Sequence, residues 1–418
     1  MKRFSLSLRL SGVALALICS AAQAESLTLM QTLAATERYS AELSASRNEA
    51  HALDAMADSA RQLPDPKLKF GIENLPVQGS NDRRFTREGM TMQRVGVMQQ
   101  YVSAEKRERK ADTLLAEAKS VNAKSSVTRA TLQRDAAQAW LELALSTRAL
   151  QTARKLLTET SAQQGAQKAS VGAGNAAPDS VLAFQIGLSA MRDKVTLAER
   201  DVQLAQARLT QLTGQSVTAI SGDLPRYERL PADERTLESG VAQHPEMVAA
   251  LSEANSAKAR SAQSAIAAIP DVEVEVWYGR RAEGYEDMAG VMVTVDLPLF
   301  TSQRQDKDHA ADISRTLQAN DQLAFIEREH VAQVQSLIAQ YNAAQALWMR
   351  QKEEVLPLVR KRASLMAAQY RSGQSQLPEL LEARRTVLDS ELSVLQAEKE
   401  MARSWAAIHW LIPQELVQ

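Results

Sequence analysis

The feature that most constrains the fold of this chain is a stretch from about residue 104 to about residue 170 that contains no proline. Its one glycine, Gly165, lies near the end. Apolar residues recur in it at steps of three or four, or at sums of these steps, which places them on one face of a helix. These positions are Leu114, Ala118, Val121, Leu132, Ala136, Ala139, Leu143, Leu150, Ala153 and Leu157.

At 1.5 Å per residue, such a stretch forms a helix about 100 Å long, far longer than a globular domain needs. A second stretch of the same kind, residues 302–370, follows about 200 positions later. Two very long helices at a fixed spacing predict one elongated body built as a tandem repeat.

The composition agrees with a body of closely packed helices. Hydrophobic residues make up 45% of the 418 residues, but aromatic residues only 4%, and alanine dominates the apolar set. Alanine stripes let helices approach closely, whereas a thick globular core needs larger side chains. The 49 basic and 50 acidic residues give a net charge of −1. No basic field is present that would indicate a nucleic-acid partner.

The first 24 residues read as a secretory signal peptide. Basic residues precede an apolar run from 10 to 18, and Ala22-Gln23-Ala24 supplies a cleavage site before Glu25. Cys19 allows a lipoprotein interpretation, but Ile18 stands where a lipidation motif needs a small residue. Cleavage after Ala24 removes the only cysteine, so the mature chain has no disulfide and no thiolate metal site.

The mature chain begins with a predicted helix over residues 27–62, which Pro64 and Pro66 end. Residues 67–75 then alternate between apolar and polar side chains, as a two-faced strand does. A polar connection over 77–89 leads to a second strand at 90–101, and the first long helix follows.

The second half repeats this order. We expect a helix at 236–268, strands at 271–278 and 291–299, and then the second long helix. The predicted organisation is therefore a first repeat at 25–220, a linker at 221–235 and a second repeat at 236–418.

Each long helix ends in a turn of small residues and the chain then returns. Residues 171–177 form the first turn, after which Pro178 and Asp179 open a helix to about residue 212. Residues 371–377 form the second, after which Pro378 and Glu379 open a helix to about residue 410. A proline and an acid in the first helical turn are favourable N-terminal chemistry.

Four strands of about ten residues, each with one apolar face, have the length of transmembrane β-strands. Four strands cannot close a barrel, and open edges are not tolerated in lipid. The strands therefore form either a soluble β-sandwich with helical arms or part of a barrel that several chains share. Two hairpins at the same end of such long helices, on a secreted chain, favour the shared barrel.

The repeated turns and the first hairpin also resemble a known family, the outer-membrane efflux factors of the TolC type. Both turns continue into matching apolar positions, Leu380, Leu381 and Ala383 after Tyr370-Arg371-Ser372-Gly373, and Val181, Leu182 and Ala183 after Val171-Gly172-Ala173-Gly174. Within the family, the first hairpin resembles the heavy-metal branch, the cobalt-zinc-cadmium and copper-silver type. The motifs concerned are Leu63-Pro64-Asp65-Pro66-Lys67-Leu68, Gly71, Asn74-Leu75-Pro76 and the run from Met90 to Gln99.

The resemblance implies a homotrimer in the outer membrane, mainly α-helical, with a twelve-stranded β-barrel and a periplasmic α-barrel. It also implies docking onto an inner-membrane resistance-nodulation-division pump through a periplasmic adaptor, with no cofactor. The exported species would be heavy-metal cations, or drugs and other small molecules if the branch differs. An outer channel is a conduit, so selection is expected in the pump.

The resemblance also suggests functional residues. Entrance or gate residues would be Asp179, Glu379, Glu382 and Tyr370; adaptor-docking residues would be Gly172, Gly174, Asn175, Arg371, Gly373 and Gln374; and lumen residues would be Lys67, Lys69, Glu73, Glu273 and Glu275. Carboxylates repeated around a narrow mouth can hold or pass cations. The simpler alternative is that Asp179 and Glu379 only complement their helix dipoles, worth about 0.3–1 kcal/mol each. Ser375 stands where a well-known drug-efflux member carries an arginine, so that member's salt-bridge latch is not expected.

Other classes of function fit less well. A periplasmic adaptor would carry one helical hairpin and soluble β-domains, and no nucleophile elbow, phosphate loop or metal-ligand motif indicates an enzyme. The five histidines, His51, His244, His309, His330 and His409, show no i, i+4 pairing, so no metal site is predicted. Met90, Met92 and Met98 could bind copper or silver, but apolar packing is the favoured interpretation. Trp277, Tyr278 and Tyr285 suggest a weak interfacial aromatic anchor.

Overall fold

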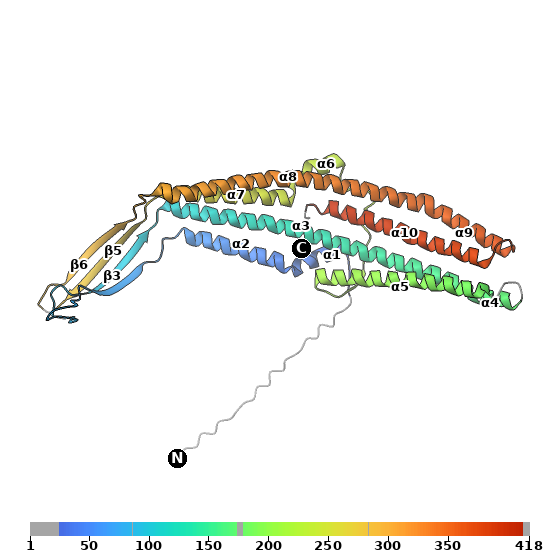
Figure 1. Ribbon diagram of the computed structural model, residues 1–418, viewed down its shortest axis with the longest axis horizontal. Helices are drawn as coiled ribbons and strands as arrows, with labels where there is room; N and C mark the ends of the chain where they lie inside the picture. Colours follow the sequence, from blue (N-terminus) through green and yellow to red (C-terminus); the bar gives the residue numbers. More distant parts are fainter. Residues whose placement is uncertain (1–24, 86, 174–178, 283, 413–418) are drawn as a thin grey trace, which may run out of the picture.

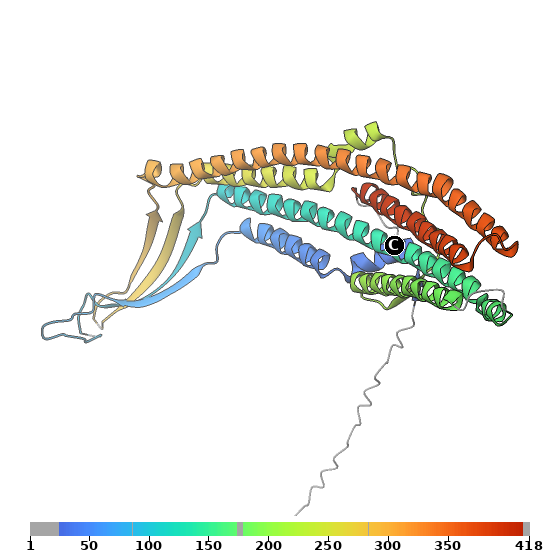
Figure 2. The ribbon, with the colours of Figure 1, turned by 45° about the vertical axis from the view of Figure 1, so that its right-hand side comes forward.

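The computed structural model describes residues 25–85, 87–173, 179–282 and 284–412 (Figure 1). A β-sheet lies at one end of an elongated body and two helical turns lie at the other, joined by long helices (Figures 1 and 2). The predicted signal peptide, residues 1–24, lies outside the described residues.

Two helices run through most of the body, α3 (Ala104–Ser161) and α8 (Gln305–Arg350). Along α3 lie α2 (Ala41–Ala60) and, further from the sheet, α5 (Asp179–Thr213). Along α8 lie α7 (Pro245–Ala265) and α10 (Leu377–His409), which both contact α3 as well. The helices predicted at 179–212 and 378–410 are confirmed as α5 and α10.

The prediction of one helix over residues 27–62 is wrong. The chain forms strand β1 (Glu25–Leu27), helix α1 (Leu29–Tyr39) and then α2. Thr28 and Gln31 make a capping box that begins α1, and Ser40 adopts an extended backbone with ψ 109°. The Ser40 hydroxyl accepts from the Leu43 N–H at 3.2 Å, which begins α2. The composition of residues 27–62 favours helix throughout. The side-chain caps at Thr28 and Ser40 nevertheless begin two separate helices, α1 and α2.

Both long helices are interrupted, which corrects the prediction of unbroken helices. The first ends with α3 at Ser161 and resumes as α4 (Gln164–Gly172). The second begins with a 3₁₀ turn (Thr301–Gln303), and after α8 it passes through one turn of π-helix (Gln351–Val355) into α9 (Leu356–Arg371). Pro357 explains the π turn, because proline lacks an N–H and its ring collides with the carbonyl four residues earlier in a regular helix.

The helix predicted at 236–268 is also divided. A short helix, α6 (Glu234–Ser239), and a 3₁₀ turn (Gly240–Gln243) precede α7. Pro245 occupies the first turn of α7, where a missing N–H costs nothing. Proline therefore fixes the start of this helix nine residues later than the periodicity suggests.

Four strands form one antiparallel sheet in the order β2 (Lys67–Glu73), β3 (Met92–Tyr101), β5 (Val272–Arg281) and β6 (Met288–Val295). The pairing of β3 with β5 joins the two halves of the chain. All four predicted strands are present, but the last lies at 288–295 rather than 291–299. Pro298 follows its end and has no N–H to donate to a neighbouring strand.

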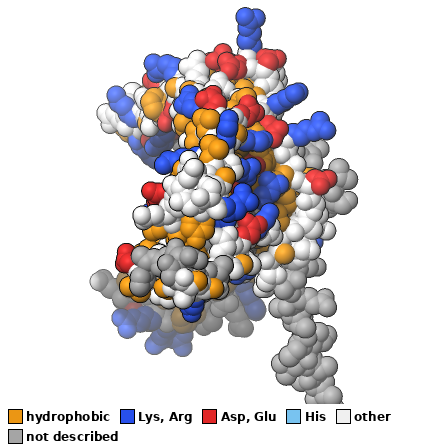
Figure 3. Space-filling view, turned by 90° about the vertical axis from the view of Figure 1, so that its right-hand side faces the viewer, with side chains coloured by type: hydrophobic (Ala, Val, Ile, Leu, Met, Phe, Trp, Pro, Cys, Tyr) orange, Lys and Arg blue, Asp and Glu red, His pale blue; other side chains and the backbone are white. Residues whose placement is uncertain are grey.

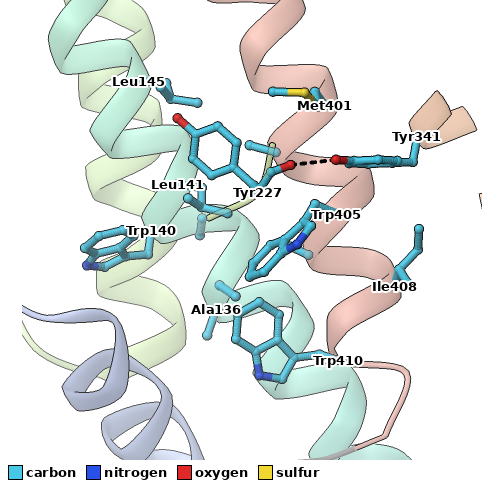
Figure 4. Close-up of a cluster of buried hydrophobic side chains, with 14 of the residues drawn as sticks. Ala136, Trp140, Leu141, Leu145, Tyr227, Tyr341, Met401, Trp405, Ile408 and Trp410 are labelled. Atoms are coloured by element: carbon cyan, nitrogen blue, oxygen red, sulfur yellow. Dashed lines mark hydrogen bonds between the residues drawn. The ribbon is translucent and has the colours of Figure 1, made fainter. Parts of the chain in front are cut away.

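The largest core lies midway along the body (Figure 4). The Trp140 indole N–H donates to the Leu27 carbonyl at 2.9 Å, and the Tyr341 hydroxyl donates to the Tyr227 carbonyl at 2.9 Å. Strand β1 pairs in parallel with β4 (Val217–Ile220), which lies next to the predicted linker. The chain between the two halves is thus packed into the core.

Two buried histidines connect α7 to α8. His244 precedes α7 and His330 lies on α8, each only 3% exposed, with ring centroids 4.6 Å apart. The Nδ1 atom of His330 lies 2.9 Å from a carboxylate oxygen of Glu246. Burial, together with the neighbouring His330, lowers the pKa of His244 to about 4.

This pKa predicts that acid destabilises the body. His244 is protonated near pH 6.5 in the unfolded chain but only near pH 4 when folded. The contribution of neutral His244 to the free energy of unfolding is therefore fully present above pH 6.5 and is lost as the pH falls from 6.5 towards 4. This contribution is at most about 3 kcal/mol. Thermal unfolding between pH 7.5 and 4.5 should show a smaller loss of stability for His244→Asn than for the wild type. Identical pH profiles would contradict the assignment.

Candidate functional site

One face of the sheet is apolar and exposed. Pairing places Leu68, Val97, Val276 and Val291 in one row across all four strands. The adjacent row contains Phe70, Val95 and Tyr278. In the single chain Phe70 is 85% exposed and Val291 67%. A contiguous apolar surface of this kind marks a contact with lipid or with another protein.

The opposite face carries a network of ion pairs. Glu275 accepts from Lys69 at 2.8 Å and from Arg94 at 2.7 Å, and Arg94 also donates to Glu73 at 2.6 Å. The Arg94 guanidinium lies 4.4 Å from the centroid of the Trp277 ring. The strand register places the five predicted lumen residues, Lys67, Lys69, Glu73, Glu273 and Glu275, on this one face.

The sequence analysis missed Arg94, which joins the two hairpins through Glu73 and Glu275. The sequence did contain one signal for it. Successive side chains of a strand point to opposite faces, so Arg94 must lie on the face opposite Gln93 and Val95. Gly290 leaves room for the Trp277 ring, because a Cβ at that position would lie 2.6 Å from it. The network therefore depends on residues from all four strands.

Both edges of the sheet are open among the described residues. Strand β2 pairs only with β3, and β6 pairs only with β5. Each edge presents a row of unpaired backbone N–H and C=O groups, which is a template for pairing with another strand. The sheet therefore has the form of a segment of a larger one.

At the far end of the body the two hairpins pack on each other. Phe184 and Leu188 of α5 form a buried cluster with Leu377, Leu380 and Leu381 of α10, and Tyr370 packs against it. Figure 3 shows this end, where apolar side chains are interspersed with charged ones. Tyr370, a predicted gate residue, thus lies against the contact between hairpins.

A second contact joins the hairpins at the break between α3 and α4. With the Gln163 amide oxygen facing Arg384 of α10, the two guanidinium nitrogens lie 2.6 and 2.5 Å from it. Burial lowers the pKa of Arg384, and the nearby Glu159 opposes this shift. Arg384 therefore connects the break between α3 and α4 to α10 of the second hairpin.

The predicted entrance carboxylates have different surroundings. Asp179 is exposed at the first position of α5. A carboxylate oxygen of Glu379 accepts from the Gln376 N–H at 3.3 Å within a capping box, so this residue does support its helix start. Glu382 is exposed and lies 3.7 Å from Arg385. Local capping thus accounts for part of the role of Glu379.

The predicted docking residues lie in or beside the two turns. Gly172 ends α4, while Gly174 and Asn175 lie outside the described residues. Gly373 has a φ of +73°, which glycine adopts without strain. The Gln374 N–H donates to the Gln369 carbonyl at 2.8 Å and the Arg371 Nε to the Ala367 carbonyl at 3.2 Å. Ser375 donates to the Met366 carbonyl of α9 at 3.4 Å, so its hydrogen bond stays within its own hairpin.

The described residues contain no group of three or more His, Cys, Asp and Glu side chains placed to hold a metal ion. Met92 and Met98 lie on the polar face of the sheet, where Met98 is 4% exposed, whereas Met90 lies in the loop before β3. No helix in the described part of the chain is both long and apolar enough to cross a bilayer.

Comparison with known proteins gives a consistent result. Residues 237–412 match the family model for outer membrane efflux proteins. None of the curated proteins matches the sequence. Among solved structures, CusC is similar with a TM-score of 0.73 at 13% identity, covering 93% of this chain and 92% of that one. At this identity the similarity shows a shared fold.

Two further solved structures show the same fold. The outer membrane protein VceC from Vibrio cholerae has a TM-score of 0.72 at 16% identity, covering 92% of this chain and 95% of that one. The MtrE outer membrane channel of Neisseria gonorrhoeae has a TM-score of 0.69 at 14% identity, covering 94% and 92%.

The ion-pair network predicts unequal effects at two neighbouring glutamates. Glu275→Gln removes the carboxylate shared by Lys69 and by the largely buried Arg94, so it should clearly destabilise the protein, because Arg94 loses one of its two ion-pair partners. Glu273→Gln should cost less than about 1 kcal/mol, because no ion pair within the described residues involves Glu273. Urea unfolding of both variants measures the loss in the free energy of unfolding. Equal losses for Glu275→Gln and Glu273→Gln would mean that the network does not stabilise the sheet.

Proposed function

We propose that this chain, whose residues 237–412 match the family model for outer membrane efflux proteins, is a subunit of an outer-membrane channel. Its passive role is to conduct solutes from a pump in the cell envelope to the exterior. The observation that carries this proposal is the two-faced sheet with both edges open, at one end of a long helical body. The similar structures include proteins described as an outer membrane protein and an outer membrane channel.

The channel is a homotrimer. In lipid, the unpaired edges of β2 and β6 must bond to other strands, and only a closed barrel satisfies every edge. Three copies of four strands give twelve, with the apolar face towards lipid and the ion-pair network towards the lumen. The helices of the three copies form the periplasmic tunnel. The repeats at 25–220 and 236–418, with the linker at 221–235, each contribute one hairpin of helices and one of strands.

The two hairpin turns form the periplasmic entrance and the surface that docks a periplasmic adaptor. The adaptor connects the channel to an inner-membrane resistance-nodulation-division pump. Asp179, Glu379 and Glu382 then recur three times around the mouth, where carboxylates attract cations. The contacts of Tyr370 and Arg384 hold the two hairpins of one chain together.

The exported species are heavy-metal cations, on the basis of the hairpin motif between residues 63 and 99. The second candidate is a channel for drugs or other small molecules. Deletion of the gene, followed by exposure of the cells to a panel of metals and drugs, separates the two candidates. Increased sensitivity to metals alone supports export of heavy-metal cations, and increased sensitivity to drugs alone supports a channel for drugs or other small molecules.

Assembly gives the first test. Native mass spectrometry of protein extracted in mild detergent should show a trimer, and a stable monomer would contradict the shared barrel.

Val274→Arg, on the apolar face, should destabilise the trimer by about 2–4 kcal/mol if the residue lies near the middle of the bilayer. Glu273→Gln, on the opposite face of the same strand, is the matched control. Equal effects of the two changes would reverse the assignment of the faces.

The entrance gives the second test. Asp179→Asn combined with Glu379→Gln should reduce cation selectivity and block by multivalent cations in planar-bilayer recordings, since both carboxylate rings lose their charge. Glutamine at position 379 loses charge but retains an oxygen that can accept from Gln376, which limits damage to the helix start. Unchanged selectivity, open probability and block would leave these residues with a capping role alone.

A further inference from the structure

A groove of about 810 Å³ lies where the helices meet the sheet. The end of α2, the start of α3 and the end of α7 form its walls. Its lining includes Met56, Leu63, Lys106, Arg107, Lys110 and Leu114. This position adjoins the exposed apolar face of the sheet, which we have proposed to lie in the outer membrane.

The charges of the groove are unbalanced. Three cations line it, Lys106, Arg107 and Lys110, against a single carboxylate, that of Asp65. Lys106 pairs with Asp271 at 2.8 Å, and the Arg107 guanidinium donates to the carbonyls of Val102 and Arg61. Lys110 is exposed and belongs to no ion pair among the described residues. Its ammonium is therefore available to a ligand.

The other wall of the groove is apolar and continues into the sheet. Met56 and Leu63 are 54% and 39% exposed, so they present apolar side-chain surface to the groove. The amide of Gln99 donates to the carbonyl of Pro64, a lining residue, at 2.7 Å. Gln99 pairs with Val274 and so lies on the apolar face. Apolar surface and cationic surface thus meet in one groove.

We propose that this groove binds an anionic phospholipid of the inner leaflet, such as phosphatidylglycerol. Lys110 contacts the headgroup phosphate, Arg107 adds positive charge, and Met56 and Leu63 contact the first part of an acyl chain. Basic side chains at the membrane surface select anionic over zwitterionic lipid in this way. The inference rests on the proposed function, because it requires the sheet to lie in a bilayer.

Native mass spectrometry of the detergent-extracted protein, with phosphatidylglycerol or phosphatidylcholine added, tests the site. The wild type should retain phosphatidylglycerol in preference to phosphatidylcholine. Lys110→Gln should weaken phosphatidylglycerol binding about fivefold, the effect of one surface cation. Arg109→Gln is the matched control, because Arg109 is an exposed neighbour on α3 that does not line the groove. It should change binding less than twofold.

Two further measurements separate the possible failures. Leu63→Ser should weaken binding of both lipids, since it alters the apolar wall without changing charge. Equal retention of the two lipids by the wild type, or equal losses of phosphatidylglycerol binding in Lys110→Gln and Arg109→Gln, would overturn the lipid site.

Fractionation of the cell membranes tests the proposed function separately. A wild-type chain that leaves the membrane in a salt wash refutes both the channel and the site, whereas a membrane-bound trimer without lipid preference refutes only the site.

Discussion

The unpaired backbone at the two edges of the sheet is the constraint on which the rest of the molecule depends. Water can solvate such edges, but lipid cannot, and each unsatisfied group there costs several kcal/mol. A chain with four strands cannot meet this requirement alone. The alternation of Leu68 and Phe70 with Lys67, Lys69 and Gly71 gives the sheet one apolar face and one polar face. In the proposed trimer, the long helices continue the same cylinder away from the membrane.

Local patterns predicted much of this architecture. Alternation identified three of the four strands and sorted Lys69, Glu73 and Glu275 onto one face, because side-chain direction in a strand follows from parity alone. Proline chemistry was equally local. The π turn before Pro357 could have been predicted from that residue, since a regular helix cannot accommodate it.

What the sequence did not reveal depends on contacts between distant residues. Arg94 pairs with Glu275, 181 positions away, and nothing near Arg94 announces the partner. The break at Gln163 contains neither glycine nor proline and coincides with a contact to Arg384 of another helix. Strand β1 has three residues, too few for a periodic signal, and it forms only because β4 and Trp140 provide bonding partners.

The bond from Trp140 to Leu27 also sets the position of the first described strand. From Trp140 to the start of α3 at Ala104, a helix rises about 54 Å. Strand β1 is therefore held about that far from the end of α3 that leads into the four-stranded sheet, and it pairs with β4 instead. The first described residues thus stabilise the central core and take no part in the four-stranded sheet.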